Sequence, residues 1–251
     1  MPTSKRQREI LRVLEHEGTV ALSVLARKLN VSLETIRRDI KLLAGSGNLV
    51  KTHGAISLAS TVAEAPFERR MRENSEAKRR IAAIVAATIR DGDSIMMDTG
   101  TTTSFLAREL TGHRRLTVVT NSSDIARTLA TLNDNRVYMA GGELRSDNGA
   151  AFGTTAIDFI SRFSVTHAII STGAVDAEGM MDYDLEEAEF ARTVLTRGRR
   201  RLVVTDHSKF GRQGLVRVCG FEAVDEVVTD REPPLEIGEQ IKSAGSSLVV
   251  A

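Results

Sequence analysis

Two short amphipathic segments joined by a tight turn constrain the fold more than any other feature of this chain. The second segment starts at Ser32, whose hydroxyl can accept a hydrogen bond from the first helical turn. Its apolar side chains recur at helical spacing, at Leu33, Ile36, Ile40 and Leu43. The first segment covers residues 23–29, and the three-residue turn Asn30–Ser32 sets two helices at a steep angle. The pattern predicts a helix-turn-helix.

The flanking residues extend this motif on both sides. Residues 8–16 form another helical segment, and residues 48–56 alternate like the two strands of a wing. An ordinary amphipathic helix with a solvated charged face would explain the segment at 33–43 alone, but it would not explain these neighbours. We therefore predict a winged helix-turn-helix domain over residues 1–57.

The outward face of this domain carries small polar and cationic side chains. A helix in the DNA major groove needs polar groups near the base edges and Arg or Lys for bases and phosphates. The predicted DNA-binding residues are Ser32, Glu34, Thr35, Arg37, Arg38, Lys41, Lys51 and His53. Among them, we expect Thr35, Arg37 and Arg38 to meet bases or backbone. We expect Lys41, Lys51 and His53 to hold phosphates.

Charge is distributed unevenly along the chain, although the total is only +1. Residues 1–54 carry ten Lys or Arg and five Asp or Glu, whereas the remaining residues carry 24 basic and 28 acidic side chains. A basic head on an acidic body suits a chain whose smaller end meets phosphate. The single cysteine, Cys219, excludes an internal disulfide, and no apolar run is long enough to span a membrane. We expect a soluble, cytoplasmic protein.

Downstream of the head, apolar runs alternate with helical segments. The runs, which we expect to be buried parallel strands, are residues 94–98, 116–120, 136–140, 168–171, 202–205, 226–229 and 247–250. Such alternation builds a parallel sheet with both faces covered, so the fold class is α/β and Rossmann-like. Pro66 and a charged run interrupt any apolar period over residues 58–76, which we predict to be a linker. Residues 77–251 would then form an effector-sensing and oligomerisation domain.

Ligands of parallel sheets sit outside the carboxyl ends of the strands, so the loops after the strands form the candidate effector site. The loop at residues 98–104 precedes a helix, turns at Gly100 and carries three threonine hydroxyls, so it can surround an anion. No Gly-Lys-Ser/Thr follows, which favours a small phosphorylated metabolite over a nucleotide; a simple capped turn is the alternative. The candidate effector-binding residues are Asp98, Gly100, Thr101, Thr102, Thr103, Asn121, Gly141, Gly142, Arg145, Asp176, Glu187 and Lys209.

Several motifs of the head resemble the DNA-binding module of the DeoR family of bacterial transcriptional regulators. They are Leu25-Ala26, Val31-Ser32, Thr35-Ile36-Arg37-Arg38-Asp39, Leu42, Gly47 and His53-Gly54. The body is similar to the family's effector domain, which is related in fold to ribose-5-phosphate isomerase. The body motifs are Asp98-Thr99-Gly100-Thr101-Thr102, Val119-Thr120-Asn121, Gly141-Gly142-Glu143-Leu144-Arg145, Glu187-Ala188 and Asp206-His207-Ser208-Lys209-Phe210-Gly211.

The resemblance implies a repressor of carbohydrate or polyol catabolism genes that a phosphorylated sugar or polyol releases from DNA. It puts the phosphate on residues 100–103 and Lys209. It puts the carbon skeleton near Asp98, Asn121, Gly142, Asp176 and Glu187. A narrower set of matches, which includes Asp158-Phe159-Ile160-Ser161 and Pro233-Pro234, points to family members that respond to glycerol 3-phosphate. We therefore expect double-stranded operator DNA, a phosphorylated effector and further copies of the chain, as a dimer or tetramer, to be its partners.

Two other classes of function are open to this sequence. A sugar-phosphate isomerase with a DNA-binding head would use carboxylates such as Asp176 and Glu187 to move a proton, together with a cation to stabilise the enediolate. Residues 173–187 contain no lysine or arginine, so the cation that the resembling enzymes place there is missing. An architectural DNA-binding protein without a small ligand is the third class. We expect no catalysis, no cofactor and no bound metal.

Overall fold

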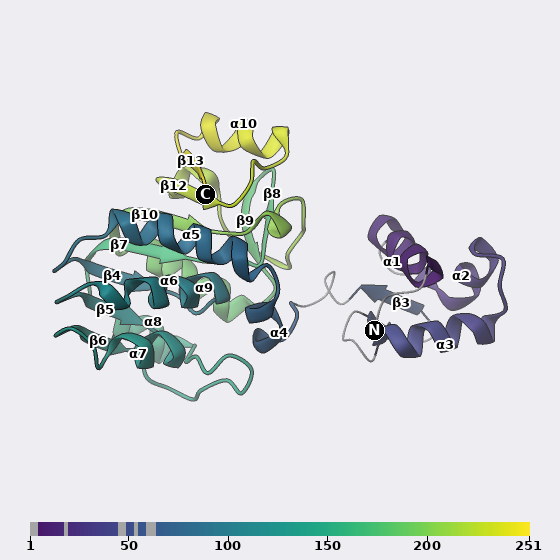
Figure 1. Ribbon diagram of the computed structural model, residues 1–251, viewed down its shortest axis with the longest axis horizontal. Helices are drawn as coiled ribbons and strands as arrows, with labels where there is room; N and C mark the ends of the chain where they lie inside the picture. Colours follow the sequence, from purple (N-terminus) through teal and green to yellow (C-terminus); the bar gives the residue numbers. More distant parts are fainter. Residues whose placement is uncertain (1–4, 18–19, 45–48, 53–54, 59–63) are drawn as a thin grey trace. The chain divides into compact units, whose positions relative to one another are not determined.

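The chain divides into two compact units, Met1–Ala65 and Pro66–Ala251, each of which is described here by itself (Figure 1). The computed structural model describes residues 5–17, 20–44, 49–52, 55–58 and 64–251. Within these ranges, no helix has both the length and the apolar character needed to cross a lipid bilayer.

The first unit is a winged helix-turn-helix (Figure 1). Its elements are α1 (Lys5–Glu17), β1 (Val20–Ala21), α2 (Leu22–Lys28), α3 (Leu33–Ala44), β2 (Leu49–Thr52) and β3 (Ala55–Leu58). A small apolar core joins them: Ile10, Leu14, Val20, Leu25, Ile36, Ile40, Leu43, Leu49 and Ile56. Because these side chains come from all six elements, the three helices and the wing form one folding unit.

The first unit differs from the prediction in two details. Leu33, the first residue of α3, lies outside the core with 37% of its surface exposed. The wing also has a third strand, since β1 pairs with β3 in an antiparallel sheet of order β1-β3-β2. β1 was not predicted, because a strand of only two residues shows no alternating pattern.

The second unit is built on a seven-stranded sheet in which every pairing is parallel. The strands in spatial order are β13 (Ser247–Val250), β12 (Glu226–Thr229), β10 (Gly198–Val204), β7 (Val165–Ile170), β4 (Ser94–Met97), β5 (Thr117–Thr120) and β6 (Arg136–Met139). All seven predicted strands are present. β7 and β10 begin earlier than predicted, because Thr166 and His167 in β7 and Arg199–Arg201 in β10 are polar and interrupt the apolar run.

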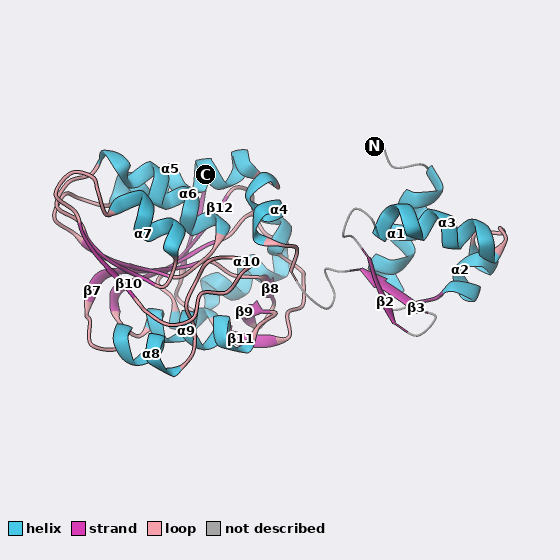
Figure 2. Cartoon of the chain, turned by 90° about the horizontal axis from the view of Figure 1, so that it is seen from below, coloured by secondary structure: helices cyan, strands magenta, loops and turns pink. Residues whose placement is uncertain are grey.

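Helices cover both faces of this sheet (Figure 2). On one face lie α5 (Ser75–Thr88), α6 (Thr101–Glu109) and α7 (Ser123–Leu129); on the other lie α8 (Thr154–Ile160), α9 (Leu185–Leu195) and α10 (Leu235–Ser243). Successive side chains of a strand point to opposite faces. Ile95 and Met97 of β4 accordingly join the core under α5–α7, whereas Met96 between them joins the other core. This arrangement confirms the predicted α/β, Rossmann-like fold class.

A second, antiparallel sheet of order β11-β9-β8 lies beside α9, formed by β8 (Ala174–Asp176), β9 (Gly179–Asp182) and β11 (Val216–Cys219). Residues 172–179 were predicted to be a loop, and this sheet was not predicted. Cys219 at the end of β11 is largely enclosed. Burial, followed by the nearby Glu222 carboxylate, raises the pKa of the Cys219 thiol to about 12.

The predicted linker is shorter in the structure. Residues 66–76 belong to the second unit, where α4 (Phe67–Arg72) and the start of α5 pack on the sensor fold. Phe67 is only 7% exposed, and the Arg70 guanidinium lies 5.7 Å from its ring centroid. The many charges of this segment obscured the one buried apolar residue, Phe67, that fixes it to the sensor fold. The stretch that separates the two units therefore ends before Pro66.

Candidate functional site

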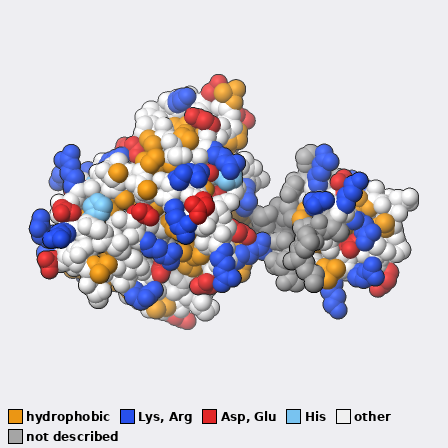
Figure 3. Space-filling view, in the orientation of Figure 1, with side chains coloured by type: hydrophobic (Ala, Val, Ile, Leu, Met, Phe, Trp, Pro, Cys, Tyr) orange, Lys and Arg blue, Asp and Glu red, His pale blue; other side chains and the backbone are white. Residues whose placement is uncertain are grey.

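The predicted DNA-binding face lies on the first turns of α3. Ser32 caps the helix, since its Oγ accepts a hydrogen bond from the Thr35 amide at 3.1 Å and lies 2.8 Å from Thr35 Oγ1. Ser32 and Glu34 are exposed and Thr35 is half-buried. The face of the first unit shown in Figure 3 carries Lys and Arg side chains with few acidic ones among them.

The cations of α3 differ in their surroundings. Arg37 lies 3.6 Å from the Glu34 carboxylate, whereas Arg38 and Lys41 are exposed and form no ion pair within the described ranges. An unpaired Arg or Lys can approach DNA without first breaking an internal contact. Lys51 lies on β2, opposite Ile56 of β3, and its side chain is outside the described part of the structure, as is all of His53.

One further residue of α3 has a structural role that was not predicted. Asp39 is 5% exposed, and its carboxylate accepts a hydrogen bond from Arg6 Nε of α1. This ion pair ties α1 to α3 and raises the pKa of Arg6. Asp39 therefore holds α3 in place, while Arg37 and Arg38 of the same helix face outward.

The predicted effector loops meet at the point where the order of the large sheet reverses. The chain runs outward from β4 to β5 and β6, and then returns to the other side of β4 with β7. In sheets of this kind, ligands bind outside the carboxyl ends of the strands at this switch point. The loop after β4 contains Asp98, whose two carboxylate oxygens accept hydrogen bonds from the Ser171 amide after β7 at 3.1 and 3.0 Å. Asp98 thus fastens the two sides of the switch point together.

The turn between β4 and α6 is tightly built around Gly100. A Cβ atom at this position would lie 1.9 Å from Ser171 Oγ and 2.8 Å from Ser171 Cβ, so only glycine fits. Thr103 is fully buried, and its hydroxyl donates to the carbonyl oxygens of Asp98 and Gly100 at 3.1 Å. Thr103 therefore shapes the turn, whereas Thr101 and Thr102 lie in the first turn of α6 at 6% and 5% exposure.

Buried polar oxygens without a partner gather at this edge of the sheet. Within the part of the chain that the structure describes, no hydrogen bond reaches Thr99 Oγ1, Asn121 Oδ1, Thr205 Oγ1 or Thr229 Oγ1. These residues stand at or just after the carboxyl ends of β4, β5, β10 and β12. Leaving a buried polar group unsatisfied costs about 1–3 kcal/mol. A polar ligand bound at this edge would satisfy these four atoms.

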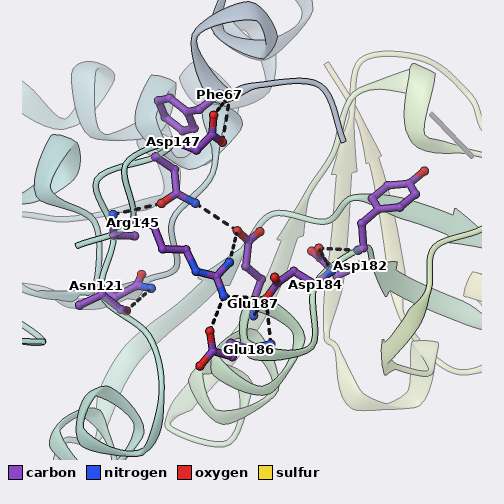
Figure 4. Close-up of polar contacts among 12 residues, drawn as sticks. Phe67, Asn121, Arg145, Asp147, Asp182, Asp184, Glu186 and Glu187 are labelled. Carbon is purple, nitrogen blue, oxygen red and sulfur yellow. Dashed lines mark hydrogen bonds and ion pairs between the residues drawn. The ribbon is translucent and has the colours of Figure 1, made fainter. Parts of the chain in front are cut away.

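Arg145 was predicted to hold the effector, but the structure gives its guanidinium three carboxylate partners already (Figure 4). Its Nη atoms lie 3.0 Å from Asp184 and 3.4 Å from Glu187, and it also pairs with Glu186. The ring centroid of Phe152 is 4.2 Å away. Arg145 therefore fastens the loop at residues 141–151 to the start of α9, a tertiary contact that sequence cannot reveal.

The remaining candidates occupy different surroundings. Gly141 and Gly142 are exposed, and Gly142 has a φ of +148°, which favours glycine. Asp176 ends β8, where its carboxylate accepts a hydrogen bond from the Glu178 amide and closes the β8–β9 turn. Glu187 accepts a hydrogen bond from Asn148 Nδ2 at 3.1 Å as well as from Arg145.

Lys209 ends the 3-10 helix η3 (His207–Lys209), which follows β10. It is half-buried and lies near the Asp206 carboxylate. Burial raises the pKa of Asp206, but hydrogen bonds from Ser208 and the charges of Lys209 and Lys78 bring it below its ordinary value. Asp206, Asn148 and Asp184 belong to this edge of the sheet and were given no role in the sequence analysis.

The Asp98→Asn substitution is expected to remove a pH-dependent loss of stability. Burial, with the charges of Asp182 and Glu187, raises the pKa of Asp98 well above its ordinary value. The folded protein therefore binds this proton more tightly than the unfolded chain. Stability declines as pH rises from about 4 through the raised pKa. Asparagine cannot ionise, so the Asp98→Asn variant lacks this loss of stability. Its melting temperature, relative to that of the wild type at the same pH, should therefore rise between pH 5 and pH 8.

The control for this measurement is Asp158→Asn, which neutralises an exposed carboxylate. Its melting temperature should follow the wild-type profile across the same pH range. Parallel profiles for Asp98→Asn and wild type would show that Asp98 does not carry this pH dependence.

Comparison with known proteins identifies both units. Residues 6–62 match the model of the DeoR-like helix-turn-helix domain, and residues 73–231 match that of the DeoR C terminal sensor domain. The chain belongs to the DeoR family. Its first unit is accordingly a DNA-binding domain, and its second unit is a sensor domain for an effector.

Relatives that match this chain over almost its whole length are transcriptional repressors. The glycerol-3-phosphate regulon repressor of Escherichia coli (strain K12) is 35% identical over 94% of each chain. The transcriptional repressor CsqR of the same organism is 32% identical over 98% of this chain and 94% of its own. The transcriptional repressor AccR of Agrobacterium fabrum is 33% identical over 91% of this chain and 90% of its own. This DeoR-family protein is thus a DNA-binding transcriptional repressor and not an enzyme.

Solved structures that are similar to this chain include ribose 5 phosphate isomerase A from Neisseria gonorrhoeae, at 16% identity and a TM-score of 0.40. The alignment covers 54% of this chain and only about half, 53%, of the isomerase. The translation initiation factor eIF-2B of Pyrococcus horikoshii OT3 is similar at 18% identity and a TM-score of 0.43, over 62% of this chain and 63% of that chain.

Proposed function

We propose that this DeoR-family protein represses genes of carbohydrate or polyol catabolism. A phosphorylated metabolite releases it from double-stranded operator DNA, and glycerol 3-phosphate is the effector that we propose. The observation that carries the proposal is the row of buried, unpartnered oxygens at the carboxyl edge of the sensor sheet, beside the glycine turn at Gly100. The name of the Escherichia coli relative supports glycerol 3-phosphate as the first effector to test.

The effector's phosphate would lie at the start of α6, where the amides of residues 100–103 and the Thr101 and Thr102 hydroxyls are donors. Lys209, from the loop after β10, would supply the cation. The hydroxyl groups of the carbon skeleton would meet Asn121 Oδ1, Asp98 and Glu187. This division suits a polyol phosphate, because a charged end and a hydroxylated end meet donors and acceptors respectively.

On the DNA side, Thr35, Arg37 and Arg38 would meet bases or backbone, and Lys41, Lys51 and His53 would hold phosphates. The protein would act in the cytoplasm as a homo-oligomer, a dimer or a tetramer. Paired heads on a symmetric oligomer require an operator with matching half-sites. Effector binding would then lower the affinity for DNA through a conformational change that passes from the sensor unit to the DNA-binding domains.

A thermal-shift screen of the wild-type protein tests the effector class. Glycerol 3-phosphate at 100 times its dissociation constant should add about 2.7 kcal/mol of stability, or roughly 5–10 °C in melting temperature. Ribose 5-phosphate and the fructose and tagatose phosphates are the alternatives within the class. Glycerol and inorganic phosphate, added separately, are the controls. If no phosphoester shifts the melting temperature, the protein is a DNA-binding protein without this ligand class.

A further inference from the structure

The helix α4 occupies a particular place in the chain. It is the first element of the second unit, so it is the part of the sensor nearest in sequence to the DNA-binding domain. Phe67 is its buried anchor, and the helix packs against α6, whose first turn lies in the proposed phosphate site. A shift of α4 would be the first sensor movement that the connecting residues receive.

One of the effector loops holds the start of α4. Both carboxylate oxygens of Asp147 lie 3.3 Å from the Phe67 amide and accept its hydrogen bond (Figure 4). Asp147 sits in the loop at residues 141–151, between Arg145 and Asn148, both of which bind Glu187. The amino end of α4 and the proposed Glu187 side of the effector site thus share one short loop.

A different effector loop holds the other end of α4. Asn74 lies two residues beyond the end of α4, at the N-cap of α5. It donates from Nδ2 to Asp206 Oδ1 at 2.9 Å, and the same oxygen accepts from the Ser208 amide at 3.0 Å. Lys78 is 3% exposed, and its Nζ donates to the carbonyl oxygens of Arg70 and of Glu73, the latter at 2.9 Å. This end of α4 is therefore fastened to the loop that carries Lys209.

We propose that α4 reports effector binding to the DNA-binding domain, with Asp147 and Asn74 as the positioning residues that couple its two ends to the effector loops. The inference rests on the proposed function, because it needs an effector that draws on Lys209 and the Glu187 region. An element fastened at one end could swing freely when its loop moves. Because α4 is fastened to both loops, an adjustment of their spacing must move or turn the helix.

The test separates coupling from binding and from folding. Asn74 has a φ of +52°, so Asn74→Gly removes the side chain at a position whose backbone glycine adopts readily. Asp147→Ala removes the acceptor at the amino end of α4. Asp147→Asn keeps an oxygen there and should retain coupling. Glu143→Ala removes an exposed carboxylate from the same loop and is the control for charge.

The DNA probe is a duplex that the wild-type protein selects from a random-sequence pool, and the effector probe is glycerol 3-phosphate. For wild type, Asp147→Asn and Glu143→Ala, saturating glycerol 3-phosphate should raise the DNA dissociation constant by about 5- to 150-fold. In the double variant Asp147→Ala/Asn74→Gly, the DNA dissociation constants measured with and without glycerol 3-phosphate should be equal. Its DNA affinity without effector, and its glycerol 3-phosphate affinity by calorimetry, should match wild type.

Each remaining outcome decides against the inference. A double variant that releases DNA as wild type does would show that α4 is not the reporter. Loss of coupling together with loss of glycerol 3-phosphate affinity, or with a lowered melting temperature, would give the two residues a merely structural role. If none of the phosphoesters releases the wild-type protein from DNA, the proposed function is overturned, and the inference along with it.

Discussion

Replacing Arg38 by alanine is expected to weaken binding of the selected DNA duplex by about 1–3 kcal/mol, or roughly five- to 150-fold. Arg38 is exposed on the second turn of α3, and it forms no ion pair in the described part of the head. An arginine in this position can make two hydrogen bonds to one guanine in the major groove. Its loss should also relax the preference for one base at one position of the site.

Lys41→Ala is the matched control, because Lys41 is a second exposed cation of α3, three residues further along. A cation that holds a phosphate carries no sequence information. This variant should bind all sequences more weakly to a similar extent and reduce the slope of log K against log salt by about one. Selection from a random pool and titrations at several salt concentrations measure both effects. Identical profiles for the two variants would refute this division of roles.

Lys209→Ala is expected to reduce affinity for glycerol 3-phosphate by about 10- to 150-fold. A hydrogen bond to a charged group contributes about 1.5–3 kcal/mol, and this variant removes the only cation that we assign to the effector phosphate. Affinity for the DNA duplex without effector should stay the same, because Lys209 lies in the sensor unit. Calorimetry with glycerol 3-phosphate and DNA titration measure the two affinities separately.

Lys242→Ala provides the comparison for this second experiment. Lys242 is exposed on α10, away from the loops at the carboxyl edge of the sheet, so its loss should leave both affinities unchanged. Should Lys209→Ala bind glycerol 3-phosphate as tightly as Lys242→Ala does, the phosphate would have to lie elsewhere. The turn at Gly100 would then need a different cation partner.

The sequence was sufficient for those parts of the fold that local physics decides. Ser32 predicted the start of α3 because a helix cap acts within one turn, and it does accept the Thr35 amide. The seven parallel strands were recognisable as apolar runs because both faces of the sheet are covered. The small antiparallel sheet was missed, since β9 pairs with β11 across more than 30 residues and neither strand has a distinctive pattern.

For the candidate site, the order of the strands along the chain allows only the loops to be grouped. Strand ends on a parallel sheet share one edge, so the loops that contain Asp98, Asn121 and Lys209 could be grouped without coordinates. The partners of Arg145 could not, because Asp184, Glu186 and Glu187 approach it only through tertiary packing. The contacts at the two ends of α4 were equally hidden. The bonds from Phe67 to Asp147 and from Asn74 to Asp206 join residues separated by 80 and 132 positions.

The enclosed thiol at the end of β11 makes the wild-type chain convenient for chemical labelling. A cysteine reacts with maleimides through its thiolate, and a pKa of about 12 leaves Cys219 almost entirely protonated at neutral pH. A cysteine introduced by Leu42→Cys, at a position 60% exposed on α3, would therefore take up a fluorescent dye selectively. The reading helix can thus be followed optically while effector is added, without first removing the native cysteine.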